Sequence, residues 1–444
     1  MEVNLQGESA RVARSTGMDL NEISSKLLNA FIQLATQPFY YIGIAIVILQ
    51  YRRQLRLERK LFHTKIHSSL GRALRTLLWG WAAGLAASIL MAFIGVSISF
   101  DIVVILWVIT FLLIFIRIRY LRLAYSAGLL GIAHSILMLL PDVHPAGFIG
   151  RLADAVREAH IPSLLLLVGF LQLIEALFIR YDGFQSAVPL FFEGKRGKIV
   201  GGYQMYRFWP VPLFLLVPAQ THQSMLLSSP IAGGDLWSAG WTLIALPAMI
   251  GFAEYTLTRL PREKALRSSK LLLIYGIAML LSALLSDFWP PATILASIAV
   301  ILLHELHAGI SRRREHRSAP QFVHDERGLK VLAVIPGGPA ERMGILPGEI
   351  IHKVNGIKVG AKEQLHKALQ ANPAFCRMEI INHENQSKFV SGAIFAGDHH
   401  QLGIVLCPDE QAGYYVSLRK ISLISLIRMG TRESAGKMSG GVSS

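Results

Sequence analysis

The residues of this chain whose types and spacing could support chemistry are ionisable side chains inside long apolar segments. His304, Glu305 and His307 lie together in one such segment. A His-Glu-x-x-His zinc site needs two histidines four residues apart, so that both imidazoles face one ion, with the glutamate as base. Here the histidines are three residues apart, and no later apolar segment supplies a third ligand. The pattern therefore argues against a zinc protease, although two histidines at this spacing still share roughly one helical face.

Two further carboxylates, Glu175 and Glu254, lie in other apolar segments. A charged group inside a membrane is costly, which makes them candidates for a proton or ion site of a transporter, but no inverted repeat is visible. The alternative is that these side chains bond across helices or reach the cytoplasmic face. Glu175, Glu254 and the His304 segment share a depth in the predicted membrane, so the sequence allows one polar cluster. His134 lies nearer mid-span and is expected to find a partner on a neighbouring helix.

The elements that must position these groups are membrane spans. The chain has 444 residues, of which 52% are hydrophobic and only 16% charged, and its mean hydropathy is +0.44. This composition excludes an ordinary soluble domain and predicts a polytopic α-helical membrane bundle of about eight to nine spans. The segment 208–221 carries three prolines and is expected to be broken or re-entrant. The nine candidate spans are 33–51, 76–98, 102–116, 123–141, 161–179, 208–221, 237–258, 271–288 and 291–310.

The distribution of positive charge predicts the topology. With nine spans, alternate loops carry nearly all the loop lysines and arginines, whereas the opposite loops contain only Arg151 and Arg157. The positive-inside rule then places the amino terminus outside and the carboxy-terminal region in the cytoplasm. The net charge of +15 is explained by this topology and by attraction to anionic inner-leaflet lipids. We therefore expect no binding of nucleic acid.

The carboxy-terminal region has the alternation and turns of a small α+β domain. Apolar residues alternate after Gly328, Pro336-Gly337-Gly338-Pro339 predicts a turn, and Asn355-Gly356 is typical of a two-residue hairpin. The elements expected after Gly328 are a strand to Ile335, strands at 350–354 and 357–359, a helix at 361–370, and strands near 378–381, 389–395, 402–407 and 414–418.

This order of elements resembles a bacterial PDZ domain, over about Gly328 to Phe395. One departure is Glu349, where the family usually carries Asp, and we expect it to affect the local turn without altering the fold. The matching residues are Gly328-Leu329, Gly338-Pro339-Ala340, Gly344-Ile345-Leu346-Pro347-Gly348-Glu349, Ile350-Ile351 and Val354-Asn355-Gly356.

A PDZ domain leaves one sheet edge open, so that an extended peptide adds to it as a strand. The resemblance implies a carboxylate-binding loop at Arg327-Gly328-Leu329, where glycine lets the backbone N–H groups turn inward. It also implies a groove between the first strand and the following helix. The alternative is a domain that only docks on its own membrane half. The residues implied to bind peptide are Arg327, Gly328, Leu329, Lys330, Val331, Ala333, Leu365, His366 and Leu369.

The sequence thus divides into an amino-terminal tail (1–30), a transmembrane helical domain (31–310), a linker (311–326), a cytoplasmic PDZ-like domain with extra strands (327–418) and a basic tail (419–444). Cys376 and Cys407 both fall in the cytoplasmic part and are expected to be reduced. We expect no cofactor and no metal site.

The whole layout resembles the MinJ-type topological determinants of cell division in Gram-positive bacteria. Looser matches are Tyr51-Arg52-Arg53 and Arg207-Phe208-Trp209-Pro210. The resemblance implies a non-enzymatic membrane scaffold at septum and poles, with cytoplasmic or membrane protein partners that include DivIVA-type and MinD-type proteins. The alternative function is an intramembrane metalloprotease-like or transporter protein with a regulatory PDZ domain.

Overall fold

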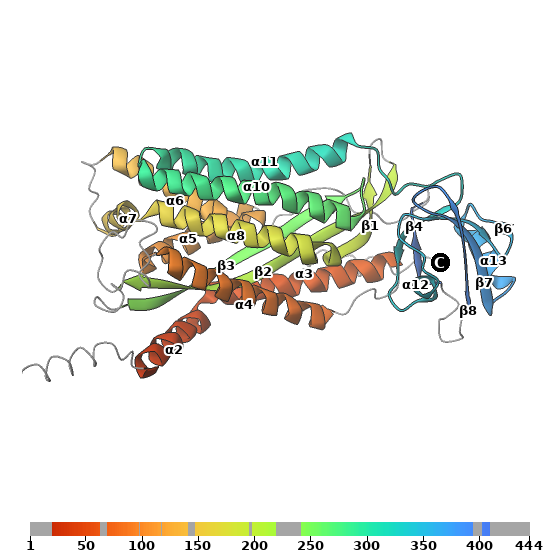
Figure 1. Ribbon diagram of the computed structural model, residues 1–444, viewed down its shortest axis with the longest axis horizontal. Helices are drawn as coiled ribbons and strands as arrows, with labels where there is room; N and C mark the ends of the chain where they lie inside the picture. The colour runs from red at the N-terminus through yellow and green to blue at the C-terminus, as the bar shows by residue number, and fades with distance from the viewer. Residues whose placement is uncertain are drawn as a thin grey trace, which may run out of the picture.

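A computed structural model gives an elongated helical bundle with a small β-rich domain at one end (Figure 1). It describes residues 20–62, 69–96, 98–116, 118–140, 147–194, 198–218, 241–393 and 402–408. The predicted strand at 414–418 and the basic tail lie outside these residues. The bundle helices are α2 (Leu20–Thr36), α3 (Pro38–Phe62), α4 (Ser69–Ile94), α5 (Phe100–Ile116), α6 (Leu123–Leu139), α7 (Phe148–Arg157), α8 (Ile161–Asp182), α10 (Pro261–Phe288) and α11 (Ala292–Arg317).

The helices long and apolar enough to cross a membrane, within the described residues, are α4, α8, α10 and α11. The pair α2 and α3, bent by 58°, counts as a fifth span if taken together, and α5 and α6 are shorter apolar helices. The count of eight to nine helical spans is therefore not confirmed. Helix α2 also begins at Leu20, inside the stretch predicted to be a tail.

Two of the predicted helical spans are strands, and this is a correction. The segments 208–221 and 237–258 fall on β2 (Ile199–Pro218) and β3 (Trp241–Thr256), which pair antiparallel along their length, with β1 (Ala187–Glu193) on the other side of β2. Pro210, Pro212 and Pro247 lie inside these segments, where each would break a helix. Both faces of the hairpin are buried, so its strands are nearly continuous apolar runs that match a span in composition. In Figure 1 the hairpin runs along the bundle among the helices.

The free edge of β2 is sealed by helix α4. A Cβ added at Gly80 would lie 2.1 Å from Pro210 O, and one at Gly84 would lie 2.1 Å from Pro212 O, so only glycine permits this approach. The two prolines have no N–H to leave unpaired on this side. Further along the same edge, Phe214 N–H donates to Ser88 Oγ at 2.7 Å. Helix α4 therefore presents a Gly-x-x-x-Gly-x-x-x-Ser stripe that fits the strand edge.

The free edge of β3 is sealed by polar side chains. Gln37 Nε2 donates to Ala245 O at 2.9 Å, Ala245 N–H donates to Gln33 Oε1 at 3.4 Å, and the Arg122 guanidinium donates to Gly251 O. Pro247 lies between the bonded positions and again has no N–H. A buried strand edge must find such partners, because an unpaired buried backbone group costs as much as a lost hydrogen bond.

The carboxy-terminal domain forms the elements that the sequence predicts. Its five-strand path is β8-β7-β5-β4-β9, with β6 paired to β5. Asn355 and Gly356 both have positive φ, 51° and 83°, as the expected hairpin turn requires. The elements are β4 (Leu329–Val334), α12 (Pro339–Arg342), β5 (Ile350–Val354), β6 (Ile357–Lys358), α13 (Lys362–Gln370), β7 (Phe375–Ile381), β8 (Ser387–Ala393) and β9 (Ile404–Leu406).

Glu349, the departure from the family pattern, still closes its turn. Its Oε2 accepts a hydrogen bond from Leu346 N–H at 2.8 Å, and its Oε1 lies 3.3 Å from Lys388 Nζ. The side chain is buried, so both contacts are shielded from water. The longer side chain thus serves the turn without altering the fold.

Candidate peptide-binding edge and buried ion network

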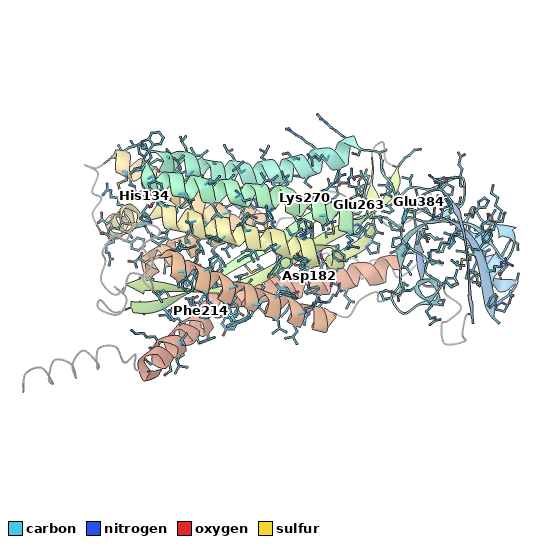
Figure 2. All side chains as sticks on the ribbon, in the orientation of Figure 1. His134, Asp182, Phe214, Glu263, Lys270 and Glu384 are labelled. Atoms are coloured by element: carbon cyan, nitrogen blue, oxygen red, sulfur yellow. The ribbon has the colours of Figure 1, made fainter. Side chains whose placement is uncertain are left out.

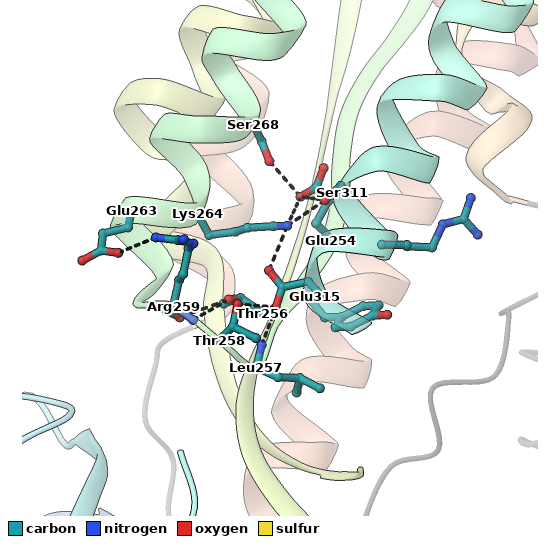
Figure 3. A network of polar contacts seen from close by, with 12 residues as sticks. Glu254, Thr256, Leu257, Thr258, Arg259, Glu263, Lys264, Ser268, Ser311 and Glu315 are labelled. Carbon is teal, nitrogen blue, oxygen red and sulfur yellow. Dashed lines mark hydrogen bonds and ion pairs between the residues drawn. The ribbon is translucent and has the colours of Figure 1, made fainter. Parts of the chain in front are cut away.

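A buried ion network joins the hairpin to the last two helices (Figure 3). Lys264 Nζ, from α10, lies 3.1 Å from Glu254 Oε2 on β3 and 3.1 Å from Glu315 Oε1 on α11. Ser268 and Ser311 each donate to Glu254 Oε2 at 2.8 Å. Each charge therefore has an opposite charge or a hydrogen-bond donor in contact, which a buried ion pair needs in order to be stable.

A second polar group lies around Arg122, just before α6. Its guanidinium is 3.2 Å from Glu175 Oε1 on α8 and also contacts His304. A crevice of only about 10 Å³ lies beside Arg122, Gln172 and Glu175. A single water needs about 10–15 Å³, so this crevice holds at most one. Glu254 does not line it, and the two carboxylates do not share a water-lined cavity there.

The histidines of the His304 segment have different partners. His304 packs against the rings of Tyr125 and Tyr275, whereas His307 Nε2 lies 3.3 Å from Glu254 Oε1. Among the described residues, no three His, Cys, Asp or Glu side chains gather as a metal site would require. Glu305 pairs with Arg119 and accepts a hydrogen bond from the Tyr125 hydroxyl. The predicted polar cluster thus forms as neighbouring ion-paired groups. His134 has the expected neighbouring partner, because its Nδ1 lies 2.8 Å from Val156 O on α7.

The strand predicted to offer an open edge is inside the sheet. Strand β4 pairs with β5 on one side and with β9 on the other, with Ala333 opposite Val405 and Val334 opposite Ile404. The expectation of a peptide groove along Leu329, Lys330, Val331 and Ala333 therefore needs correction, because a strand of the same chain occupies that edge. Leu329 and Val331 are buried in the domain core, and Lys330 Nζ donates to Gln321 O.

The predicted carboxylate-binding loop is also occupied by internal contacts. The Arg327 guanidinium makes paired bonds to Asp325, at 3.0 and 2.8 Å, and donates to Asn385 Oδ1 at 2.9 Å. The hydrogen bond from Arg327 lowers the pKa of Asp325 to about 2, so this carboxylate stays charged. A Cβ at Gly328 would lie 2.2 Å from Ile351 O. Gly328 is therefore explained by close packing of the backbone.

Strand β9 is one of the two end strands of this sheet among the described strands. Gly403 O accepts a hydrogen bond from Ile335 N–H at 2.7 Å, so the next residue, Ile404, turns its own N–H and C=O away from β4. The side chains of Ile404 and Leu406 pack on the domain core together with Leu365 and Leu369 of α13. His366 is exposed on the same helix.

The opposite face of the β4–β9 pair docks on the membrane half. Val405 and Leu332 share a buried cluster with Phe322 of the linker and Tyr203 of β2, and the Tyr203 hydroxyl donates to Leu332 O. Ala333, predicted to line a groove, lies in this contact instead. Cys407 packs at the margin of this docking cluster, and burial raises its pKa to about 12. Burial in the domain core raises the pKa of Cys376 to about 11, so both thiols stay protonated. The docking alternative is therefore present in the structure, and it leaves the outer edge of β9 without a described strand.

The sequence analysis did not predict Arg119, Arg122, Lys264 and Glu315 as charged partners of the expected cluster. The predicted spans leave Lys264 in a loop and Glu315 in the linker 311–326, yet both are buried. Strand 402–407 was predicted, and β9 confirms it, but its position beside β4 was not. A signal was available in Leu402-Gly403-Ile404, where a glycine before alternating apolar residues repeats the pattern of Gly328-Leu329.

These features define a class: a membrane protein with apolar spanning helices and a carboxy-terminal PDZ domain. A family model described as PDZ domain matches residues 330–381. The chain is 29% identical over 387 residues to the cell division topological determinant MinJ of Bacillus subtilis (strain 168), which covers 84% of this chain and 93% of that protein. It is 26% identical over 272 residues to the probable cell division topological determinant MinJ of Lacticaseibacillus paracasei, covering 58% of this chain and 69% of the relative.

The resemblance to MinJ-type proteins is thereby confirmed, and with it the PDZ domain and the membrane-helix character. No solved structure matches the chain. The relatives are named for a role in cell division topology, and a PDZ domain is a protein-interaction domain.

Proposed function

We propose that this protein is a membrane-anchored, non-enzymatic scaffold of division-site topology that recruits proteins through its PDZ domain. The observation that carries the proposal is the outer edge of β9, an end strand of a sheet fixed to the membrane bundle. An extended segment of a partner adds to such an edge through main-chain hydrogen bonds, with side-chain pockets supplying specificity. On this proposal the peptide runs beside Ile404 and Leu406, and Leu369 and His366 of α13 contribute contacts.

The domain limits and topology are part of the proposal. The PDZ domain lies in the cytoplasm and the amino terminus outside, with the protein concentrated at septum and poles. The uneven loop charge supports this orientation. The proposed orientation does not change when two helical spans are replaced by strands. The antiparallel pair β2 and β3 begins and ends at the same end of the bundle.

We further propose DivIVA-type and MinD-type proteins as partners, together with anionic inner-leaflet lipids. The support for the protein partners is the resemblance to MinJ-type determinants. The support for lipids is the net charge of +15, most of it on the loops assigned to the cytoplasm.

The test uses Ile404→Pro, which removes the outward N–H of β9 while leaving the bonds of Gly403 and Cys407 to β4 in place. Ile404→Val is the matched control, because it keeps the N–H and a branched side chain. Both are imaged as fluorescent fusions in dividing cells that lack the native protein. We expect the valine variant to collect at septa and restore division, and the proline variant to spread evenly over the membrane and leave cells elongated. Normal division with the proline variant would refute the edge as the recruiting site, and normal division without the protein would refute the scaffold.

A further inference from the structure

A crevice of about 250 Å³ opens on the outer surface of the bundle between α8 and α10. Its floor and walls are apolar, formed by Ala176 and Leu177 of α8 and by Leu273 and Ile274 of α10. Leu177, Leu273 and Ile274 are exposed by 46%, 40% and 64%, so this surface faces the surroundings of the bundle. In a membrane protein those surroundings are lipid chains.

Two cations line the same crevice, Arg180 on α8 and Lys270 on α10. Both are exposed. Some other cations in this part of the bundle are engaged, such as Lys264 by Glu254 and Arg207 by Asp182. Among the described residues, neither Arg180 nor Lys270 has a hydrogen bond or ion pair. The crevice therefore combines an apolar slot with two positive charges that the protein itself does not neutralise.

Each of the two cations lies at one end of the apolar run of its helix, where the headgroups of a surrounding bilayer would lie. Arg180 is the first exposed charged residue of α8, two residues before the helix ends, and Lys270 precedes an apolar run on α10 that continues to Ser286. The two helices pack against each other and run in opposite directions, so both charges lie toward the end of the bundle that carries the PDZ domain (Figure 1). Figure 2 marks Lys270 and, two residues beyond Arg180, Asp182 in this half of the bundle.

We propose that this crevice is a specific site for an anionic phospholipid. The phosphate of the lipid lies between Arg180 and Lys270, and one acyl chain fills the slot beside Leu177, Leu273 and Ile274. A basic pocket between helices at this depth has the chemistry that recognises anionic headgroups. A free phosphate would use the two cations but not the slot, which is why the site is assigned to a lipid.

The site is distinct from the general attraction of basic loops to the inner leaflet and is independent of the peptide-binding edge. Each basic residue near an anionic surface raises affinity roughly fivefold. Neutralising both cations should therefore lower the preference for an anionic lipid roughly 25-fold if they act on one headgroup. Neutralising two cations elsewhere removes the same net charge and leaves the crevice intact.

The experiment uses full-length protein purified in detergent and mixed with phosphatidylcholine alone or with phosphatidylglycerol, and native mass spectrometry measures retained lipid. Arg180→Gln/Lys270→Gln is compared with Arg313→Gln/Arg314→Gln, an exposed pair at the end of α11. We expect phosphatidylglycerol to be retained selectively by the native protein and the α11 variant, and lost from the crevice variant. Leu177→Trp, which fills the slot without changing charge, should also lose the lipid.

Three results would overturn the assignment. Equal loss of phosphatidylglycerol in both double variants would mean that only net charge matters. Full retention by Leu177→Trp would mean that no acyl chain occupies the slot. Displacement of the lipid by inorganic phosphate at the same concentration would make the ligand a free anion. A thermal melt of each variant in phosphatidylcholine identifies misfolded protein, and Leu177→Ala serves as the second slot variant if the tryptophan does not fold.

Discussion

The two sheets of this protein treat their edges in opposite ways. In the bundle, both free edges of the β2–β3 hairpin are sealed by helix backbone and by side chains such as Ser88, Gln37 and Arg122. In the PDZ domain, β9 has a neighbour on one side only among the described strands. Backbone inside a membrane must be satisfied internally, whereas an edge in water is free to bind a partner. A change at a strand edge should therefore cost stability in the membrane sheet and binding in the PDZ sheet.

We expect the greatest loss of stability from a change at Lys264, which joins β3 to α11 through Glu254 and Glu315. Lys264→Met leaves Glu254 and Glu315 as two buried carboxylates without their shared cation, which should cost about 3–5 kcal/mol of unfolding free energy. Thermal unfolding in detergent measures it. Arg267→Met, an exposed cation on the same helix, is the control and should change little. Adding Glu315→Gln to Lys264→Met should recover part of the loss, and no recovery would contradict the pairing.

Gly84→Ala should give the second largest loss of stability, because it disrupts the close contact between α4 and the edge of β2. The new Cβ would meet Pro212 O at 2.1 Å, and backbone cannot move away as a side chain can. We expect a loss of about 3 kcal/mol and faster proteolysis of the solubilised protein. Leu85→Ala, next to it but exposed by 46%, provides the comparison. If the two variants have the same melting temperature, helix α4 does not seal the edge of β2.

Ser88→Ala removes one hydrogen bond from the same seal. Phe214 N–H would be left buried and unpaired, which costs about 1–3 kcal/mol. Ser88→Thr keeps the hydroxyl and tests the bond separately from side-chain size. Hydrogen exchange at Phe214, followed by mass spectrometry, should accelerate in the alanine variant only. Unchanged exchange there would show that this edge tolerates an open group.

Ile404→Pro is expected to change stability least, because it alters a strand edge that has no described neighbour, unlike the sealed edges of β2 and β3. The lost N–H points away from β4, so, measured against Ile404→Val, which also trims the side chain on the core, the free energy of unfolding should change by about 1 kcal/mol or less. The same kind of change in the membrane sheet, a backbone group altered at a strand edge, should be several times more costly. A large loss of stability in Ile404→Pro would mean that the outer edge of β9 is already used within the protein.

The sequence predicted the PDZ elements well because each carries a local signal. Asn355-Gly356 is a strong turn signal, and the apolar alternation at 329–335 predicts a strand, although β4 is in fact buried on both faces. Which strands become neighbours is set by contacts between distant parts of the chain. Ile404 reaches β4 from far along the sequence, and nothing near Ala333 reports that its edge is taken. The predicted binding residues on β4 therefore lie in the expected domain, on a strand whose edge is taken by β9.

The membrane half was predicted at the level of hydropathy only. A strand buried on both faces is as apolar as a spanning helix, so composition cannot separate the two. The alternation of Pro210 and Pro212 was the local clue, since two prolines on one edge suit a strand that needs no N–H there. The expected polar cluster was found, but its partners Lys264 and Glu315 lie outside the predicted spans, and charge alone does not report that they are buried.

The contacts that seal the β2–β3 hairpin also predict the order in which its parts are covered during synthesis. The helices that cover β2, α3 and α4, are synthesised before it, so its edge can be covered as it leaves the ribosome. Glu254 of β3 must wait for Lys264 and Glu315, which follow it in the chain. We therefore expect nascent chains that end before α11 to protect β2 and the paired part of β3 from protease, because the partners of both edges precede them in the chain, and to leave the end of β3 around Glu254 still accessible. Pulse-labelled truncations of increasing length would reveal this succession, and protection of the Glu254 end before α11 is made would exclude it.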